Sequence, residues 1–93
     1  MRKEYLVKRQ VKAILKSLDC YWIMPQGTGF GNSGAADFYG CYEGKCFAIE
    51  CKSQGAKPTA LQMSHLMRVM ANGGKALVVD ESNINTLRDW IVS

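Results

Sequence analysis

One segment limits the possible folds of this chain more than any other: residues 36–52, ADFYGCYEGKCFAIECK. Strand-forming residues fill 36–42 and 45–52, and Glu43-Gly44 between them suits a two-residue hairpin turn. Residues at equal distances from that turn face one another across an antiparallel pair. The segment therefore predicts a β-hairpin whose register is set by the turn.

This register brings charged side chains together. Asp37 faces Glu50, and the alternation of side chains along a strand places Lys52 on the same face as both acids. Directly opposed carboxylates destabilise a sheet unless a cation lies between them, and their hard oxygen atoms suit Mg²⁺ or Mn²⁺. The alternative is an exposed sheet face on which the Lys52 ammonium screens the two acids.

Residues 2–18 have the pattern of an amphipathic helix. Apolar side chains recur at steps of three and four residues, at Val7, Val11, Ile14, Leu15 and Leu18. One further step toward the N-terminus reaches Glu4, so its carboxylate is predicted to face the sheet. An acid in the first helical turn also suits the helix dipole, which is the alternative reason for Glu4.

The other elements predict a sheet flanked by helices. They are a short buried strand at 20–24, a helix from Pro58 to Asn72, a buried strand at 75–80 and a last helix capped by Ser82 or Asn83. The apolar residues expected to face the core are Met63, Leu66, Met67 and Met70 in the first of these helices and Leu87, Trp90 and Ile91 in the second. The order α-β-β-β-α-β-α predicts one α/β (α+β) domain over residues 1–93 with a central mixed sheet.

Positive charge is concentrated near the start of the chain, which carries a net charge of +4. Half of its twelve Lys and Arg residues lie in the first sixteen positions. This clustering favours a polyanionic partner such as DNA, although a solvated helix face often carries the same residues. The candidate DNA-binding residues are Lys8, Arg9, Lys12, Lys16 and Lys57.

Other function classes have weaker support. The four cysteines form no C-x-x-C pair and His65 is the single histidine, so a zinc finger is not expected. The glycines at 27, 29, 31 and 34 resemble a phosphate-binding loop, but they lead into a strand and not into a helix, which leaves nucleotide binding as a minor alternative. Without a membrane-length apolar run or a secretion signal, we expect a cytoplasmic protein with free thiols.

The charged hairpin resembles the core motif of the PD-(D/E)XK nuclease superfamily, in which one acid is followed across a hairpin by a second acid, any residue and a lysine. Along nearly the whole chain the sequence is similar to the VRR-NUC family, the virus-type replication-repair nucleases. The matching elements are Glu4, G-A-A-D at 34–37, E-C-K at 50–52, K-P-T-A-L-Q at 57–62 and N-G-G-K-A-L-V-V at 72–79. The main departure is Ala36, where the family usually has proline, and it removes no ligand.

The resemblance implies a restriction-endonuclease-like core with a Mg²⁺ or Mn²⁺ site. The ion would be held by Asp37, Glu50, the backbone carbonyl of Cys51 and Glu4, the last directly or through water. Lys52 would orient or deprotonate the attacking water, or neutralise charge that develops on the phosphate. Gln62 would hydrogen-bond near Lys52, although an ordinary polar residue on an exposed helix face is an equal alternative.

The activity that the resemblance implies is metal-dependent endonucleolytic hydrolysis of DNA phosphodiester bonds. Small free-standing members of the family are homodimers that cut branched DNA such as Holliday junctions, and they are commonly encoded by phages. We therefore expect a homodimeric, structure-selective DNA repair nuclease, with the methionine-rich helix at 63–70 as one candidate dimer surface. The alternative is a non-catalytic basic nucleic-acid-binding module of a replication or repair assembly.

Overall fold

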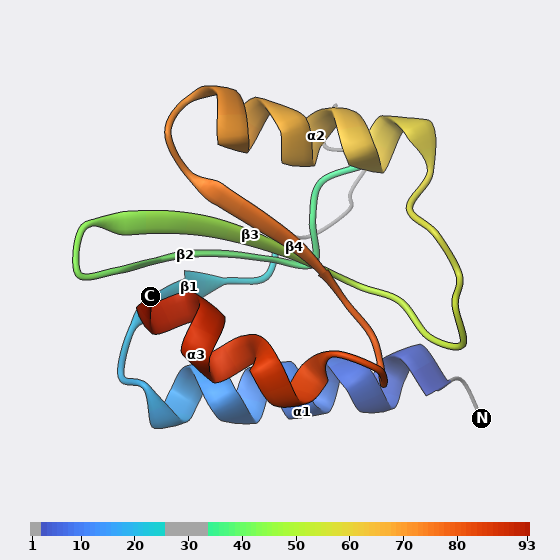
Figure 1. The fold of residues 1–93 in the computed structure, drawn as a ribbon, viewed down its shortest axis with the longest axis horizontal. Coiled ribbons are helices and arrows are strands. Elements are labelled where there is room, and N and C mark those ends of the chain that lie inside the picture. Colours follow the sequence, from blue (N-terminus) through green and yellow to red (C-terminus); the bar gives the residue numbers. More distant parts are fainter. Residues whose placement is uncertain (1–2, 26–33) are drawn as a thin grey trace.

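The computed structural model describes residues 3–25 and 34–93, which form an α+β domain (Figure 1). Its elements are α1 (Lys3–Ser17), β1 (Tyr21–Ile23), β2 (Phe38–Tyr42), β3 (Lys45–Cys51), α2 (Ala60–Ala71), β4 (Lys75–Val79), the 3₁₀ helix η1 (Ile84–Thr86) and α3 (Leu87–Val92). The expected mixed sheet flanked by helices is confirmed. Within the described ranges, no helix is both long enough and apolar enough to cross a membrane.

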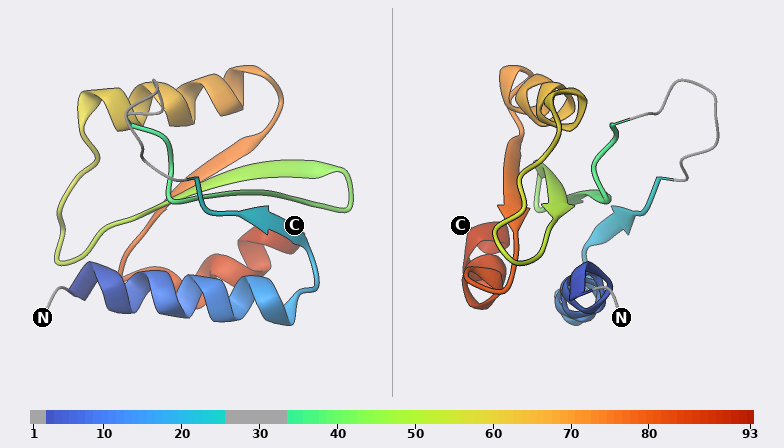
Figure 2. Two further views of the ribbon diagram at one scale, coloured as in Figure 1. Left: turned by 180° about the vertical axis from the view of Figure 1, so that it is seen from behind. Right: turned by 90° about the vertical axis from the view of Figure 1, so that its right-hand side faces the viewer.

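The sheet has the strand order β1-β2-β3-β4. The first three strands pair antiparallel, and β4 pairs parallel with β3. The helix α2 covers one face, while α1 and α3 cover the other (Figure 2). The central strand β3 lies between these layers, so its residues from Phe47 to Cys51 are all buried. As the central strand, β3 positions the residues of any site at the end of the sheet.

The predicted hairpin register is confirmed. Tyr42 pairs with Lys45 and Cys41 with Cys46, and the pairing continues to Phe38 and Ile49. Both turn residues have positive φ, 48° at Glu43 and 83° at Gly44, as the two-residue turn favoured in hairpins requires. The two opposed cysteines are free thiols whose Sγ atoms lie 2.6 Å apart.

The core lies mainly between the sheet and the pair α1 and α3. The stripe predicted on α1 supplies Val7, Val11 and Leu15, all fully buried, and α3 supplies Leu87 and Ile91. A smaller cluster of Ala36, Ala48 and Leu66 lies between the sheet and α2. Tyr39, Val69, Ala76 and Val78 are partly buried and pack against this cluster, and Leu66 is the buried residue of α2.

Several burial predictions were wrong. On α2, Leu66 is buried, but Met63, Met67 and Met70 are 36%, 59% and 47% exposed. The strand β1 lies at the edge of the sheet, and both Tyr21 and Ile23 are exposed. In β4, Val79 is buried and the preceding four residues are half-buried.

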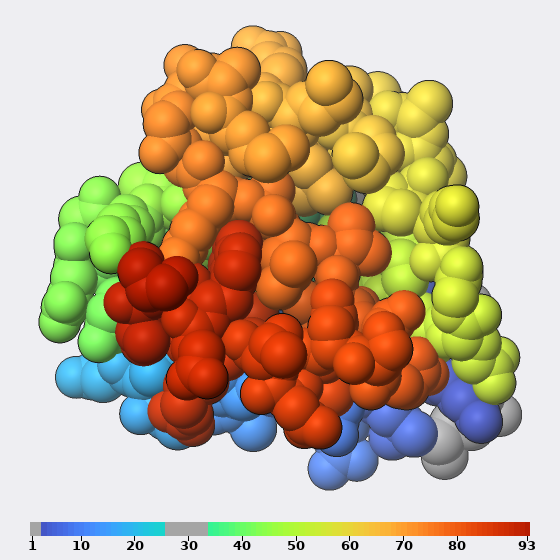
Figure 3. Space-filling view, in the orientation of Figure 1, coloured from blue at the N-terminus to red at the C-terminus, as the bar shows by residue number. Residues whose placement is uncertain are grey.

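Asn83, one of the two predicted caps of the last helix, occupies the N-cap position of η1, which leads directly into α3. The Asn83 side chain makes no capping bond to η1. Its Oδ1 accepts from the Asp80 amide and its Nδ2 donates to the Val78 carbonyl, so it closes the turn that follows β4. Figure 3 shows that this turn and the segment after β3 lie on the side of the molecule away from the hairpin turn.

Gly40 is expected to tolerate no larger residue. A Cβ atom at this position would collide with the Tyr21 carbonyl of β1 and lie 2.6 Å from Cζ of Phe47. We expect Gly40→Ala to lower the free energy of unfolding by about 1–2 kcal/mol, because the clash involves backbone as well as a buried ring. Urea unfolding at constant m-value measures this change, and an unaltered midpoint would contradict the predicted contact between β1 and β2.

Candidate active site

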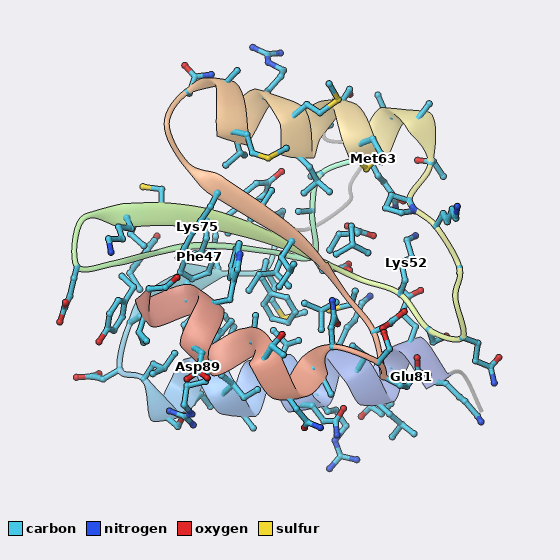
Figure 4. All side chains as sticks on the ribbon, viewed as in Figure 1. Phe47, Lys52, Met63, Lys75, Glu81 and Asp89 are labelled. Carbon is cyan, nitrogen blue, oxygen red and sulfur yellow. The ribbon has the colours of Figure 1, made fainter. Side chains whose placement is uncertain are left out.

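Charged side chains gather at the open end of the hairpin, which is the end away from its turn. Asp37 directly precedes β2, Glu50 is in β3 and Lys52 directly follows β3. In Figure 4, Lys52 extends from the end of β3 on the side of the molecule where Glu81 follows β4. The first two turns of α1 add Glu4 and Lys8. The site therefore combines two strand ends with the start of a helix.

The Asp37 carboxylate is fixed by the backbone of β3. Its Oδ2 accepts a hydrogen bond of 2.8 Å from the Cys51 amide. Alternate amides of a strand point to opposite neighbours, and the next amide, that of Lys52, donates to the Val79 carbonyl of β4. The Cys51 amide thus points toward β2, whose pairing has already ended at Phe38. Asp37 takes the place of a strand carbonyl and is oriented by doing so.

Glu50 is a buried carboxylate whose two oxygens differ. The side chain is 2% exposed, and Oε2 lies 3.4 Å from Nζ of Lys52. The other oxygen, Oε1, is buried and has no hydrogen-bond partner among the described residues. Burial, together with the nearby Asp37 charge, raises the pKa of Glu50 to about 7 although Lys52 opposes the rise. A proton, a water molecule or a cation at Oε1 would satisfy this group.

Lys8 joins the site from α1. Its Nζ lies 3.3 Å from Oδ1 of Asp37 and 3.6 Å from Oε2 of Glu4. Burial lowers the pKa of Lys8, but Asp37 and Glu4 outweigh burial, so the pKa of Lys8 is raised overall. Lys8 is one of the residues predicted to bind DNA, and its ammonium faces two of the predicted ligands. The four-residue spacing of Glu4 and Lys8 was the sequence signal for this contact.

The Cys51 thiol belongs to the hydrophobic core. It is fully buried within the core cluster between the sheet and α1. Burial and the neighbouring Asp37 and Glu50 charges raise the pKa of the thiol, which therefore stays protonated. The backbone amide of Cys51 contacts the site by donating to Asp37.

Gln62 has a structural role that we did not expect from its sequence context. It is the third residue of α2, and its Oε1 accepts from the Thr59 amide while Thr59 Oγ1 accepts from the Gln62 amide. This reciprocal pair is a capping box, which satisfies two amides at the start of the helix. Its side-chain oxygen is thereby engaged at Thr59, and the described contacts do not bring Gln62 to Lys52.

The remaining predicted DNA-binding residues lie apart from the acids. Arg9 and Lys16 are exposed on α1, Lys12 is half-buried and Lys57 is exposed in the segment between β3 and α2. Arg9 stacks over the Tyr5 ring, with 5.9 Å from its guanidinium carbon to the ring centroid. The glycines at 27, 29 and 31 lie outside the described residues.

Ala36 uses a donor that a proline would lack. Its amide donates to the Tyr39 hydroxyl over 3.0 Å, and its side chain is buried. This bond closes the chain just before Asp37 and stabilises the approach to the site. The departure from the family pattern at this position is therefore accompanied by a specific contact.

The donor set fits a hard divalent cation. Carboxylates from Asp37, Glu50 and Glu4 are the oxygen ligands that Mg²⁺ accepts, and Oε1 of Glu50 has no hydrogen-bond partner among the described residues. Among residues 3–25 and 34–93, however, no three His, Cys, Asp or Glu side chains approach closely enough to form a ready metal site. Lys8 lies between two of the three acids.

No protein-family model matches the chain, and no curated protein matches it either. The resemblance to VRR-NUC nucleases therefore depends on the residues and their arrangement alone.

Proposed function

We propose that this protein is a metal-dependent DNA endonuclease with a restriction-endonuclease-like core. The observation that carries the proposal is the buried Glu50 carboxylate, which lies beside Lys52 and has an oxygen without a partner in the described ranges. A purely structural residue at this place in β3 would be apolar, because burial of a charge costs several kcal/mol. A buried acid next to a lysine at the end of a sheet is typical of a functional site.

Asp37, Glu50, the backbone carbonyl of Cys51 and Glu4 would hold the cation. When bound, Mg²⁺ or Mn²⁺ would polarise the scissile phosphate and lower the pKa of an attacking water. Asp37 contributes a carboxylate that the Cys51 amide already orients. Glu50 contributes the oxygen that lacks a partner.

Lys52 acts as the positive charge of the site. Its side chain is 12% exposed, and its Nζ lies 3.4 Å from Oε2 of Glu50. An ammonium that is held beside the reacting phosphate stabilises the negative charge that develops in the transition state. We therefore favour this electrostatic role over proton abstraction for Lys52.

DNA and a second copy of the chain are the proposed partners. Arg9 and Lys16, both exposed on α1, supply charge for phosphate contacts. The exposed methionines of α2 supply a surface for a two-fold dimer, which would place two sites for paired cuts in branched DNA. Four free thiols suit the reducing cytoplasm as its compartment.

A cleavage assay tests the proposal. Linear duplex, flap, fork and four-way junction DNA are incubated with the protein and Mg²⁺, with EDTA and with Lys52→Ala as inactive controls. We expect cleavage that needs Mg²⁺ or Mn²⁺ and is fastest on a branched substrate. If wild type and Lys52→Ala behave alike on all four, the nuclease assignment is wrong.

The exposed basic residues of α1 also suit a binding module that does not cut DNA. Calorimetric titration with Mn²⁺ separates the two functions, because a pure binding module has no need of a specific metal site. Saturable Mn²⁺ binding that Asp37→Asn weakens favours the nuclease.

A further inference from the structure

Lys8 belongs to the site by position, but neither the hairpin motif nor the proposed chemistry uses it. It contacts Glu4, one turn earlier on α1, and Asp37, which comes from the start of β2. Its side chain is 33% exposed, and the carboxylates of Glu4 and Asp37 are 27% and 19% exposed. The ammonium therefore sits at a half-buried junction between α1 and the hairpin.

The geometry of Asp37 makes this contact specific. One carboxylate oxygen is held by the Cys51 amide, so the other is aimed at Lys8 with little freedom to rotate. The ion pair with Glu4 follows from the helix, because residues four apart lie on one face. Lys8 thus bridges two acids that come from different elements and are far apart in the sequence.

A divalent cation shared by these acids would occupy much the same space. Mg²⁺ binds carboxylate oxygens at about 2.1 Å, whereas Nζ of Lys8 lies 3.3 Å from Asp37 and 3.6 Å from Glu4. Both acids cannot turn to the metal while Lys8 remains between them, and two cations at that separation repel each other. The lysine has a flexible four-carbon stem and is able to move aside.

We propose that Lys8 is a tethered counter-ion of this site, whose ammonium holds Glu4 and Asp37 when no divalent cation is bound and competes with the cation for them. This inference rests on the proposed metal-dependent function and adds a residue that sets its metal affinity. Lys8 is a positioning residue, since it acts through the acids and not on the substrate. It also explains why three acids that share one end of the fold do not close on one another in the described structure.

Calorimetric titration of the DNA-free protein with MnCl₂ tests the proposal. The variants are Lys8→Met, which removes the ammonium and keeps the stem, and Lys16→Met, the same change at an exposed position in the last turn of the same helix. We expect Lys8→Met to bind Mn²⁺ about three- to tenfold more tightly, because two partly exposed ion pairs no longer oppose the metal. Lys16→Met changes net charge equally and should bind within twofold of wild type.

Thermal melting supplies a second readout. Without metal, Lys8→Met should melt at a lower temperature than wild type, because Glu4 and Asp37 lose their shared counter-ion. Saturating MnCl₂ should then raise its melting temperature by more than it raises that of wild type. If Lys8 had only a structural role, Lys8→Met would lower the melting temperature equally with and without MnCl₂. The increase that the metal causes would then be the same as in wild type. If Lys8→Met does not fold, Lys8→Gln replaces it in both measurements.

The outcomes separate the two proposals. If wild type binds Mn²⁺, Asp37→Asn weakens that binding, and Lys8→Met binds no more tightly than wild type, the counter-ion proposal is wrong and the nuclease proposal stands. If wild type shows no saturable Mn²⁺ binding that Asp37→Asn weakens, the metal-dependent function fails and the role of Lys8 fails with it.

Discussion

Replacing Lys52 with methionine is expected to slow DNA cleavage by about 10²–10⁴-fold at saturating Mg²⁺, with DNA affinity changed only a fewfold. Lys52 lies 3.4 Å from Glu50 and is largely buried, so few other cations are able to reach the same point. Methionine keeps the length of the aliphatic stem and removes the ammonium. The measurement is single-turnover cleavage of the preferred branched substrate, with affinity measured separately in Ca²⁺.

Lys45→Met is the matched control for this prediction. Lys45 lies in the same strand as Glu50 but beside the hairpin turn, where it is exposed and donates to the Ser93 carbonyl. The Lys45→Met substitution removes one positive charge from β3 far from the acids. It should leave the cleavage rate within a fewfold of wild type. An equal loss in both variants would show that net charge, and not the position of Lys52, decides the rate.

The hairpin could be predicted from sequence because its information is local. The turn residues Glu43 and Gly44 fix the register, and with it the neighbourhood of Asp37, Glu50 and Lys52. The apolar stripe of α1 was equally legible, since its period matches a helix. Predictions of this kind depend on neighbours in the sequence and on one regular geometry.

Burial on α2 could not be predicted in the same way. A helix with methionines at helical spacing has an apolar face, but how much of that face is covered depends on the sheet below it. Here the buried cluster between α2 and the sheet is small, with Leu66 as its residue from α2 and Val69 packed against it, and the methionines remain exposed. The extent of the contact with another element decided the outcome.

The role of Lys8 was hidden for a related reason. Its spacing from Glu4 is visible in the sequence, but its approach to Asp37 depends on how α1 crosses the end of the hairpin. The Cys51 amide, which orients Asp37, becomes available because the β2–β3 pairing stops at Phe38 and Ile49, one pair short of the predicted pair of Asp37 and Glu50. The composition of the site was therefore more predictable than its internal contacts.

Replacing Glu50 with glutamine is expected to stabilise the metal-free protein, although it alters a buried residue. The pKa of Glu50 rises from an ordinary 4.5 to about 7 in the folded state, first because of burial and then because of Asp37. Below pH 4.5 the carboxyl is protonated in both states and folding carries no ionisation cost. As pH rises toward 7 the unfolded state releases its proton first, so the wild-type protein loses stability by about 3 kcal/mol.

The neutral amide of glutamine avoids that cost. We compare the free energy of unfolding of Glu50→Gln with that of wild type at each pH. This difference should favour the variant by about 2–3 kcal/mol more at pH 8 than at pH 5, or by roughly 10 °C in melting temperature. Melting in EDTA at the two pH values measures the difference. Glu43→Gln, at the exposed turn, is the matched control and should show no such dependence on pH.

Metal binding should reverse the order of stability at pH 8. Adding Mn²⁺ would supply the partner that Oε1 of Glu50 lacks, so wild type gains stability and Glu50→Gln gains little. Glu50→Gln would then be more stable than wild type without metal, less stabilised by metal and inactive in cleavage. This combination would show that β3 carries the buried acid for function at the expense of stability. If Glu50→Gln is destabilised equally at both pH values, the carboxylate is a structural partner of Lys52, and the site has to be sought elsewhere in the chain.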